Sequence, residues 1–75
     1  MDETIRLVLA EHGRLAVDPS SIDERTDLFD AGMTSHASVN VMLALESRFD
    51  IEFPDHMLRR GVFASVASIS AAVAA

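Results

Sequence analysis

The chain has 75 residues, which is enough for one small domain, and we expect residues 1–75 to form a single one. It contains no cysteine, which excludes disulfide bonds and thiolate zinc sites, so apolar packing must stabilise it. Twelve acidic residues against six arginines and no lysine give a net charge of −6, which disfavours nucleic-acid binding. A catalytic pocket is hard to build in so small a body, so we expect no enzyme activity from the chain alone.

The N-terminus and the apolar segments indicate the compartment. Residues 1–10 lack the basic start and the long apolar stretch of a signal peptide. Residues 62–75 are the most apolar stretch, but they are too few and too often interrupted by serine to span a bilayer. We therefore expect a cytoplasmic protein without membrane contact, and we also expect a monomer.

The first predicted helix starts near Asp2 and Glu3 and has its apolar stripe between residues 5 and 12. Its apolar positions recur at intervals of three and four residues, the period of a helix with one buried face. These positions are Ile5, Val8, Leu9 and His12. Gly13 is an early stop signal, and a continuation to Leu15 is the alternative.

A long loop is predicted over residues 16–34, where no sustained period occurs. Ile22, Leu28 and Phe29 are isolated apolar residues that we expect to hold the loop on the core. Gly32, near its end, suits a tight approach or a positive φ. A loop of this length in so small a domain is usually functional.

The strongest predicted helix covers residues 35–49, and Thr34 and Ser35 are both suited to cap its start. Apolar residues recur along it at helical spacing, with polar residues on the other face. The expected buried stripe is Val39, Met42, Leu43, Leu45, Glu46 and Phe49, and the other face carries His36, Asn40 and Ser47.

A short helix is predicted over residues 55–60, because Pro54 favours a helix start and Gly61 a helix end. Arg59 and Arg60 are expected to interact with the negative dipole end of this helix, and contact with a partner or with an attached arm is the lesser alternative.

The final predicted helix begins after Ser65, which is a good cap residue. Its apolar stripe is Val66, Ile69 and Val73. Together these elements predict an all-α fold, a small bundle of three main helices and one short helix with a long first loop.

Ser35 is the residue best placed for chemistry. It follows a glycine-containing turn and opens the longest amphipathic helix, so we expect its hydroxyl to be exposed. The backbone N–H groups and the positive dipole end of a helix start favour a phosphate at this position. Position alone leaves two interpretations open: covalent modification through a phosphate by another protein, or a purely structural cap.

The residues around Ser35 resemble a known family. Residues 27–36, DLFDAGMTSH, are similar to the segment of acyl carrier proteins that contains the serine bearing 4′-phosphopantetheine. The similarity continues through residues 44–46, ALE, to residues 49–54, FDIEFP, and to residues 63–69. It implies an acyl-carrier-like bundle and a phosphoprotein with 4′-phosphopantetheine attached to Ser35.

Two departures from the common pattern point to a narrower group. Thr34 stands where most acyl carrier proteins have Asp, and His36 stands where most have Leu. The runs GMTSH at residues 32–36, VNVMLALE at residues 39–46 and MLRR at residues 57–60 resemble bacterial aminoacyl carrier proteins, which are served by amino acid:[carrier protein] ligases.

The resemblance also implies partners. A phosphopantetheinyl transferase attaches the arm to Ser35 from coenzyme A, and Mg²⁺ takes part only in that reaction. An amino acid:[carrier protein] ligase, or another acyl-adenylating enzyme, activates a carboxylic acid as an adenylate, and the arm then holds the acid as a thioester. The expected contacts with a partner or with the arm are Met33, Thr34, His36, Asn40, Met57 and Arg59.

Two other functions stay open at this point. One is a free-standing acyl or peptidyl carrier for fatty acid, polyketide or nonribosomal peptide synthesis, and the other is an unmodified helical adaptor. We expect no metal site, since His12, His36 and His56 fall on different elements without ligand spacing. Ser35 and His36 do not indicate a hydrolytic site either, because catalytic triads are assembled in space rather than by adjacency.

Overall fold

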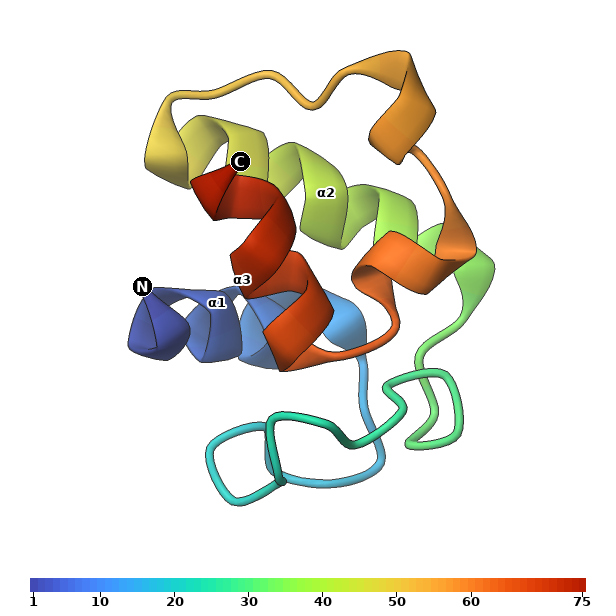
Figure 1. Ribbon diagram of the computed structural model, residues 1–75. Coiled ribbons are helices and arrows are strands. Elements are labelled where there is room, and N and C mark those ends of the chain that lie inside the picture. The colour runs from blue at the N-terminus through green and yellow to red at the C-terminus, as the bar shows by residue number, and fades with distance from the viewer.

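A computed structural model describes residues 1–75 and places three α-helices around one apolar core (Figure 1). Asp2–Val8 forms α1, which continues as a π-helical segment, η1, over Leu9–Gly13. Ser35–Phe49 forms α2, and Val66–Ala74 forms α3. There is no β-strand, and the predicted all-α bundle is confirmed.

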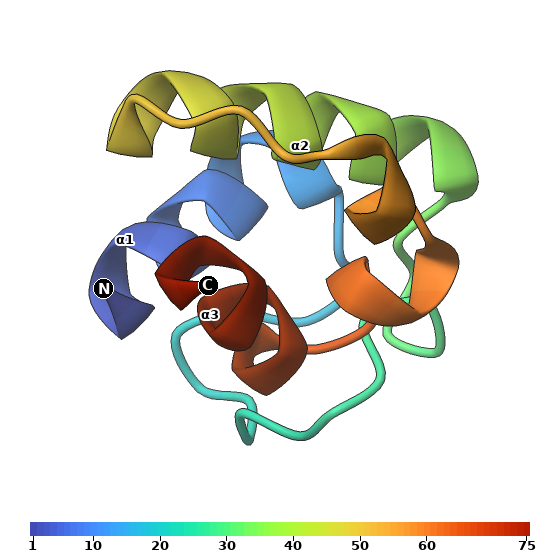
Figure 2. The ribbon, with the colours of Figure 1, turned by 45° about the horizontal axis from the view of Figure 1, so that its top comes forward.

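In Figure 2, α2 runs along one side of the molecule with α1 and α3 below it; α2 packs on η1 and α1, and α3 packs on α1. The core consists of twelve buried apolar residues that come from every α-helix, from η1 and η3 and from the connecting segments. They are Ile5, Val8, Leu9, Leu28, Met33, Ala37, Val41, Leu45, Phe53, Phe63, Val66 and Ile69. No helix combines the length and the apolar composition that are needed to cross a bilayer.

The first helix ends close to its predicted boundary. Ile5, Val8 and Leu9 are fully buried, as the periodicity predicts, whereas His12 is exposed. The helical segment stops after Gly13, because Arg14 adopts a left-handed conformation with a φ of 54°. The alternative, a helix that continues to Leu15, is therefore wrong.

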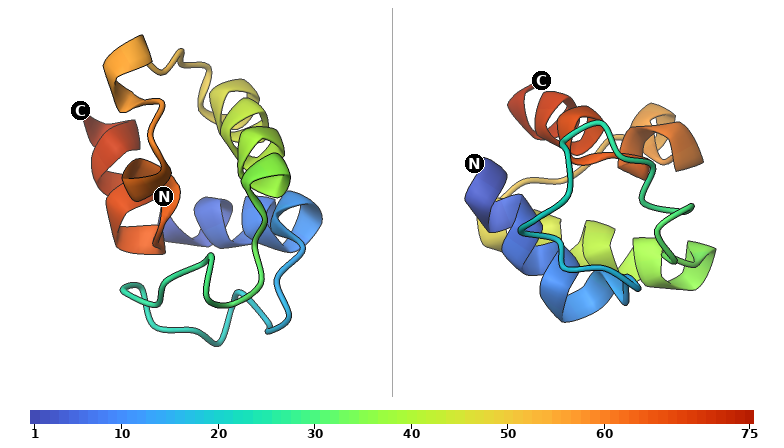
Figure 3. Two further views of the ribbon diagram at one scale, coloured as in Figure 1. Left: turned by 90° about the vertical axis from the view of Figure 1, so that its right-hand side faces the viewer. Right: turned by 90° about the horizontal axis from the view of Figure 1, so that it is seen from below.

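The long first loop is fixed to the helices through its backbone. The Arg6 guanidinium on α1 donates to the carbonyl oxygens of Pro19 and Ile22 at 2.7 and 2.6 Å. On the other side, the Ala67 N–H near the start of α3 donates to the Glu24 carbonyl at 2.9 Å. The loop thus passes beneath α1 and the start of α3 and delivers the chain to α2 in a defined direction (Figure 3, right).

Two predicted loop features are confirmed. Leu28 is fully buried in the core, and Ile22 and Phe29 pack against it while partly exposed. Gly32 has a φ of 114°, and a Cβ at this position would lie 3.1 Å from the backbone nitrogen of Ala16. Both the backbone conformation and the close approach therefore require glycine just before α2.

The buried face of α2 differs from the predicted stripe. Ala37, Val41 and Leu45 are buried, whereas Val39 and Leu43 are 51% and 53% exposed. The predicted stripe contains Leu45 but omits Ala37 and Val41, and it includes Val39 and Leu43, which lie two positions away and so on another face of the helix. An apolar strip therefore remains on the outer side of α2.

The predicted short helix over residues 55–60 is wrong. Two 3-10 turns replace it, η2 at Asp55–Met57 and η3 at Arg60–Phe63, and Gly61 lies inside the second turn. Leu58 and Arg59 lie between the turns, and Arg59 is extended with φ −130° and ψ 150°. The segment is pinned instead by Phe63, whose ring packs edge-on against Phe53 with centroids 5.5 Å apart.

Candidate functional site

Ser35 lies where the long loop becomes α2, and the cap of this helix is its neighbour. Thr34 is extended, with φ −86° and ψ 164°, and its Oγ1 accepts a hydrogen bond from the Ala37 N–H at 3.0 Å. Ser35 is the first residue of the helix, and its exposed hydroxyl makes no hydrogen bond within the molecule. The structural-cap interpretation therefore applies to Thr34, and the Ser35 hydroxyl is free for chemistry.

A groove of about 330 Å³ begins at Ser35. Val39 and Met42 of α2 line one wall of the groove, and Leu58 and Phe63 line it from the segment around η3. Apolar walls beside an exposed hydroxyl suit a flexible, partly apolar group that is attached to that hydroxyl.

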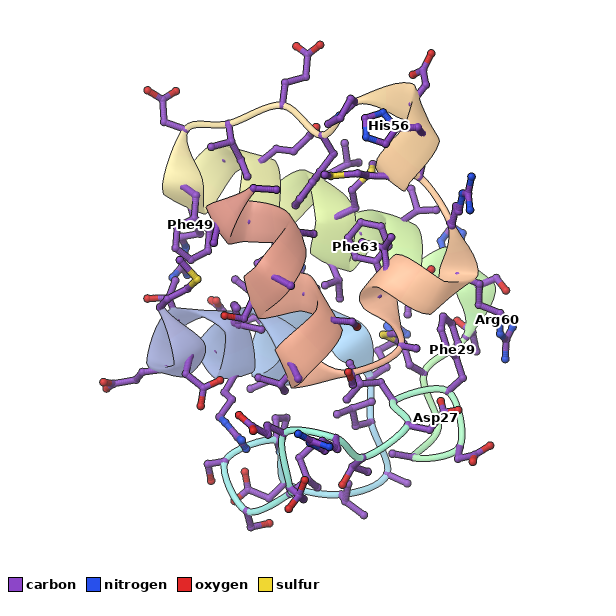
Figure 4. The ribbon with its side chains drawn as sticks, viewed as in Figure 1. Asp27, Phe29, Phe49, His56, Arg60 and Phe63 are labelled. Atoms are coloured by element: carbon purple, nitrogen blue, oxygen red, sulfur yellow. The ribbon has the colours of Figure 1, made fainter.

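Two cations and an aromatic ring also line this groove. Arg59, Arg60 and Phe29 all line the same groove as Ser35. The guanidinium carbon of Arg60 lies 3.9 Å from the centroid of the Phe29 ring, a cation–π contact (Figure 4). The groove therefore combines contributions from the long loop, from α2 and from the segment before α3.

The predicted contact residues separate into those near Ser35 and those elsewhere. Arg59 lines the groove, and His36 is exposed next to Ser35 without a hydrogen bond to it. Asn40 faces a different hollow between η1 and α2, which also contains His12 and Arg48.

Met33 and Met57, two of the predicted contacts, do not line the groove with Ser35. Met33 is only 3% exposed, because it packs in the core behind the start of α2, so the prediction of a surface contact is wrong for this residue. Met57 lines a separate hollow with Phe53 and Val73. Leu58, the next residue, lines the groove with Ser35.

Phe29 is not among the contact residues predicted from the sequence, where it is only an anchor of the loop. For Arg60, contact with a partner or with the arm is only the lesser alternative to a helix-dipole role, and the structure does not contain that helix. The adjacent arginines were the available signal, since they are the only basic pair in an acidic chain. No group of three or more His, Asp or Glu side chains is placed to hold a metal ion.

A small helical bundle with a free hydroxyl at the start of its longest helix, beside a groove, has the features of a carrier domain for a covalently attached group. Comparison with known sequences agrees with this class. The sequence profile described as "Phosphopantetheine attachment site" matches residues 7–73, and the chain belongs to this family.

Known relatives include carrier proteins of two kinds. The chain is 48% identical over 69 residues to the aminoacyl carrier protein of Agrobacterium fabrum, a match covering 92% of this chain and 83% of the relative. It is 37% identical over 54 residues to the acyl carrier protein of Caulobacter vibrioides, covering 71% and 67% of the two chains.

A solved structure matches the whole chain. It is the carrier protein from Agrobacterium tumefaciens, crystallised with an engineered Bradyrhizobium japonicum glycine:[carrier protein] ligase and AMP. The match covers 100% of both chains at 45% identity, with a TM-score of 0.97. The acyl-carrier-like fold and the resemblance to aminoacyl carrier proteins are thus confirmed.

Proposed function

We propose that Ser35 bears a 4′-phosphopantetheine arm and that the protein carries an amino acid on it as a thioester. The observation that carries this proposal is the Ser35 hydroxyl, which is exposed and unbonded at the first residue of α2 while Thr34 performs the capping. The residues present fit such a group, because the groove beginning at Ser35 offers room and apolar walls for an attached arm.

The attachment step requires only one group from this chain. The Ser35 Oγ attacks the coenzyme A phosphorus that bears pantetheine, while its proton passes to a base of the phosphopantetheinyl transferase. The new Oγ–P bond replaces the bond to 3′,5′-ADP, which departs. We assign the Mg²⁺ ion of this reaction to the transferase.

The arm, once attached, supplies a terminal thiol that holds the acyl group as a thioester. This chain contributes a fixed attachment point and a helix face, and no general acid or base. His36 makes no hydrogen bond to Ser35, which is consistent with that role. We therefore propose that the protein is a carrier and not an enzyme.

The loading partner that we propose is an amino acid:[carrier protein] ligase. The support is the 48% identity to an aminoacyl carrier protein and the whole-chain match to a carrier protein crystallised with a glycine:[carrier protein] ligase. The exposed strip of α2 that follows Ser35, with Val39 and Leu43, offers such an enzyme an apolar surface. The cytoplasmic location and the monomeric state stay predictions.

Intact-mass spectrometry tests the attachment. After incubation with a phosphopantetheinyl transferase, coenzyme A and Mg²⁺, the mass should rise by one phosphopantetheine, and peptide mapping should locate it at Ser35. No gain in mass, or a gain at another residue, would contradict the proposal and leave the unmodified adaptor as the better interpretation.

A second mass measurement tests the cargo. The modified protein, incubated with ATP, the glycine ligase and glycine, should gain one glycyl group that hydroxylamine removes, as expected of a thioester. The 37% identity to an acyl carrier protein keeps the acyl carrier alternative relevant. That alternative would be favoured if protein isolated from its own host carried a long acyl chain on the arm and never an amino acid.

A further inference from the structure

Two cations at the groove have no acidic partner within the molecule. Among the six arginines, Arg6 pairs with Asp2 at 3.2 Å and Arg48 pairs with Glu11 at 2.7 Å. The other four form neither an ion pair nor a side-chain hydrogen bond, and of these only Arg59 and Arg60 are adjacent and line the groove with Ser35. Adjacent unpaired guanidinium groups in an acidic protein repel each other and attract an anion.

The position of Arg60 is held by an aromatic ring. Its guanidinium lies over Phe29, with 3.9 Å between the guanidinium carbon and the ring centroid. Phe29 is fixed in turn, because it packs on the core and its N–H donates to the Asp27 carboxylate at 2.9 Å. A stacked guanidinium keeps the N–H donors at its edge available, and their planar fork matches a phosphate group.

Ser35 lines the same groove as these two arginines, so an anion attached to its hydroxyl enters the groove beside them. We propose that Arg59 and Arg60 bind the phosphodiester that links the arm to Ser35, and that Phe29 positions Arg60 for this contact. The inference rests on the proposed function, since it requires a phosphodiester on Ser35.

Binding at the phosphodiester has a consequence for the rest of the arm. The same groove is also lined by Val39, Met42 and Leu58, which offer apolar surface to the uncharged part of the arm. Anchoring the charged end therefore favours a docked arm in equilibrium with one that extends into solvent. The ligase, which acts on the holo-protein, would meet both forms.

The test uses the holo-protein, whose modification is first verified by intact mass. The double variant R59Q/R60Q removes both cations, and the matched double variant R14Q/R25Q removes the same charge away from the groove. Two readouts are compared: the ³¹P line width of the phosphodiester, and the apo-to-holo changes in the amide shifts of Ser38, Met42 and Leu58.

We expect a broadened ³¹P line and clear amide shift changes in the unsubstituted holo-protein and in R14Q/R25Q. In R59Q/R60Q, the ratio of docked to free arm should fall by about fivefold, the upper range for an exposed charge pair. F29L should give a smaller fall in the same direction, because Arg60 keeps its charge and loses its support. Added salt should reduce the difference between the variants.

The outcome that overturns this inference is distinct from failure of the proposed function. If R59Q/R60Q gains the arm normally but its ³¹P line and amide shifts match those of R14Q/R25Q, the arginines do not bind the phosphodiester. If the spectra of the two double variants match but the KM of the ligase for the carrier rises only in R59Q/R60Q, the arginines bind an acidic surface of the ligase. The inference is equally wrong in that case. Absence of any mass gain in the unsubstituted protein would instead contradict the attachment itself.

Discussion

The starts of α2 and α3 use hydroxyl side chains in opposite ways. At α3, the Ser65 Oγ accepts from the Ser68 N–H at 3.1 Å, and the Ser68 Oγ accepts from the Ser65 N–H at 3.1 Å and donates to the Val62 carbonyl at 2.8 Å. At α2, Thr34 alone caps the helix and Ser35 remains unbonded and exposed. The comparison shows that the hydroxyl of Ser35 stays free because its neighbour Thr34 caps the helix, whereas the hydroxyl of Ser65 is itself the cap.

Ser35→Ala should give the largest functional effect and almost no structural one. We expect complete loss of the phosphopantetheine mass gain, because the hydroxyls of Thr34 and Ser38 are engaged in hydrogen bonds. The free energy of unfolding should change by less than about 0.5 kcal/mol, since an exposed, unbonded group is removed. Urea unfolding and intact mass measure the two effects, and Ser38→Ala is the matched control that should still be modified.

Ser68→Ala should give the largest loss of stability among the helix-start variants. It removes the acceptor of the Ser65 N–H and the donor to the Val62 carbonyl in a half-buried position, which we expect to cost about 2 kcal/mol. Urea unfolding gives the value. The mass gain at Ser35 should be unchanged, and a loss of modification in a protein that still folds would break the division between the two helix starts.

Thr34→Ala should lower stability by less than Ser68→Ala does. It removes one cap hydrogen bond at an exposed site, and caps of this kind contribute about 1 kcal/mol. Thr34→Ser retains the acceptor and should restore most of the loss. If Thr34→Ala left the unfolding free energy unchanged while Ser35→Ala lowered it, the assignment of the cap would be reversed.

The Asp18 carboxylate in the long loop should give the smallest effect on stability. The Ser20 N–H and Oγ donate to the Asp18 carboxylate at 2.9 and 2.8 Å, and these hydrogen bonds hold the pKa of Asp18 below its usual range. A depressed folded-state pKa contributes stability above the unfolded pKa, and this contribution disappears as the pH falls through the folded value. Because Asp18 is fully exposed, the effect should be small.

The stability difference between the unsubstituted protein and Asp18→Asn measures this contribution. We expect the difference to shrink as the pH is lowered from about 6 to about 3, the range in which aspartates titrate. A difference independent of pH would show that the ionised form of Asp18 is not the one that the Ser20 donors stabilise.

The sequence predicted the parts of the fold that depend on local chemistry. Gly32 before α2, Ser65 before α3 and the buried Leu28 in the loop are all confirmed, because each reflects a local backbone or burial requirement. The family resemblance around Ser35 is confirmed as well, since a modification signal is a continuous run of residues.

The remaining features depend on contacts between distant segments. Nothing local distinguishes Val39 from Val41, and only packing against α1 and η1 decides which of them is buried. Glu46 was placed on an apolar stripe, but its carboxylate accepts the Phe53 N–H at 2.8 Å and so fixes the turn after α2. The groove itself could not be predicted, because residues 29, 35 and 60 are brought together only by the tertiary fold.

The two cations that line the groove with Ser35 are guanidinium groups. This matters for a thioester held near them. An arginine side chain keeps its proton at any physiological pH, so it attracts negative charge without becoming a nucleophile. A lysine in either place would provide the same charge, but its deprotonated fraction could capture an activated carboxyl group as a stable amide. Arginine at both positions would therefore attract the phosphate without reacting with the thioester of the proposed carrier.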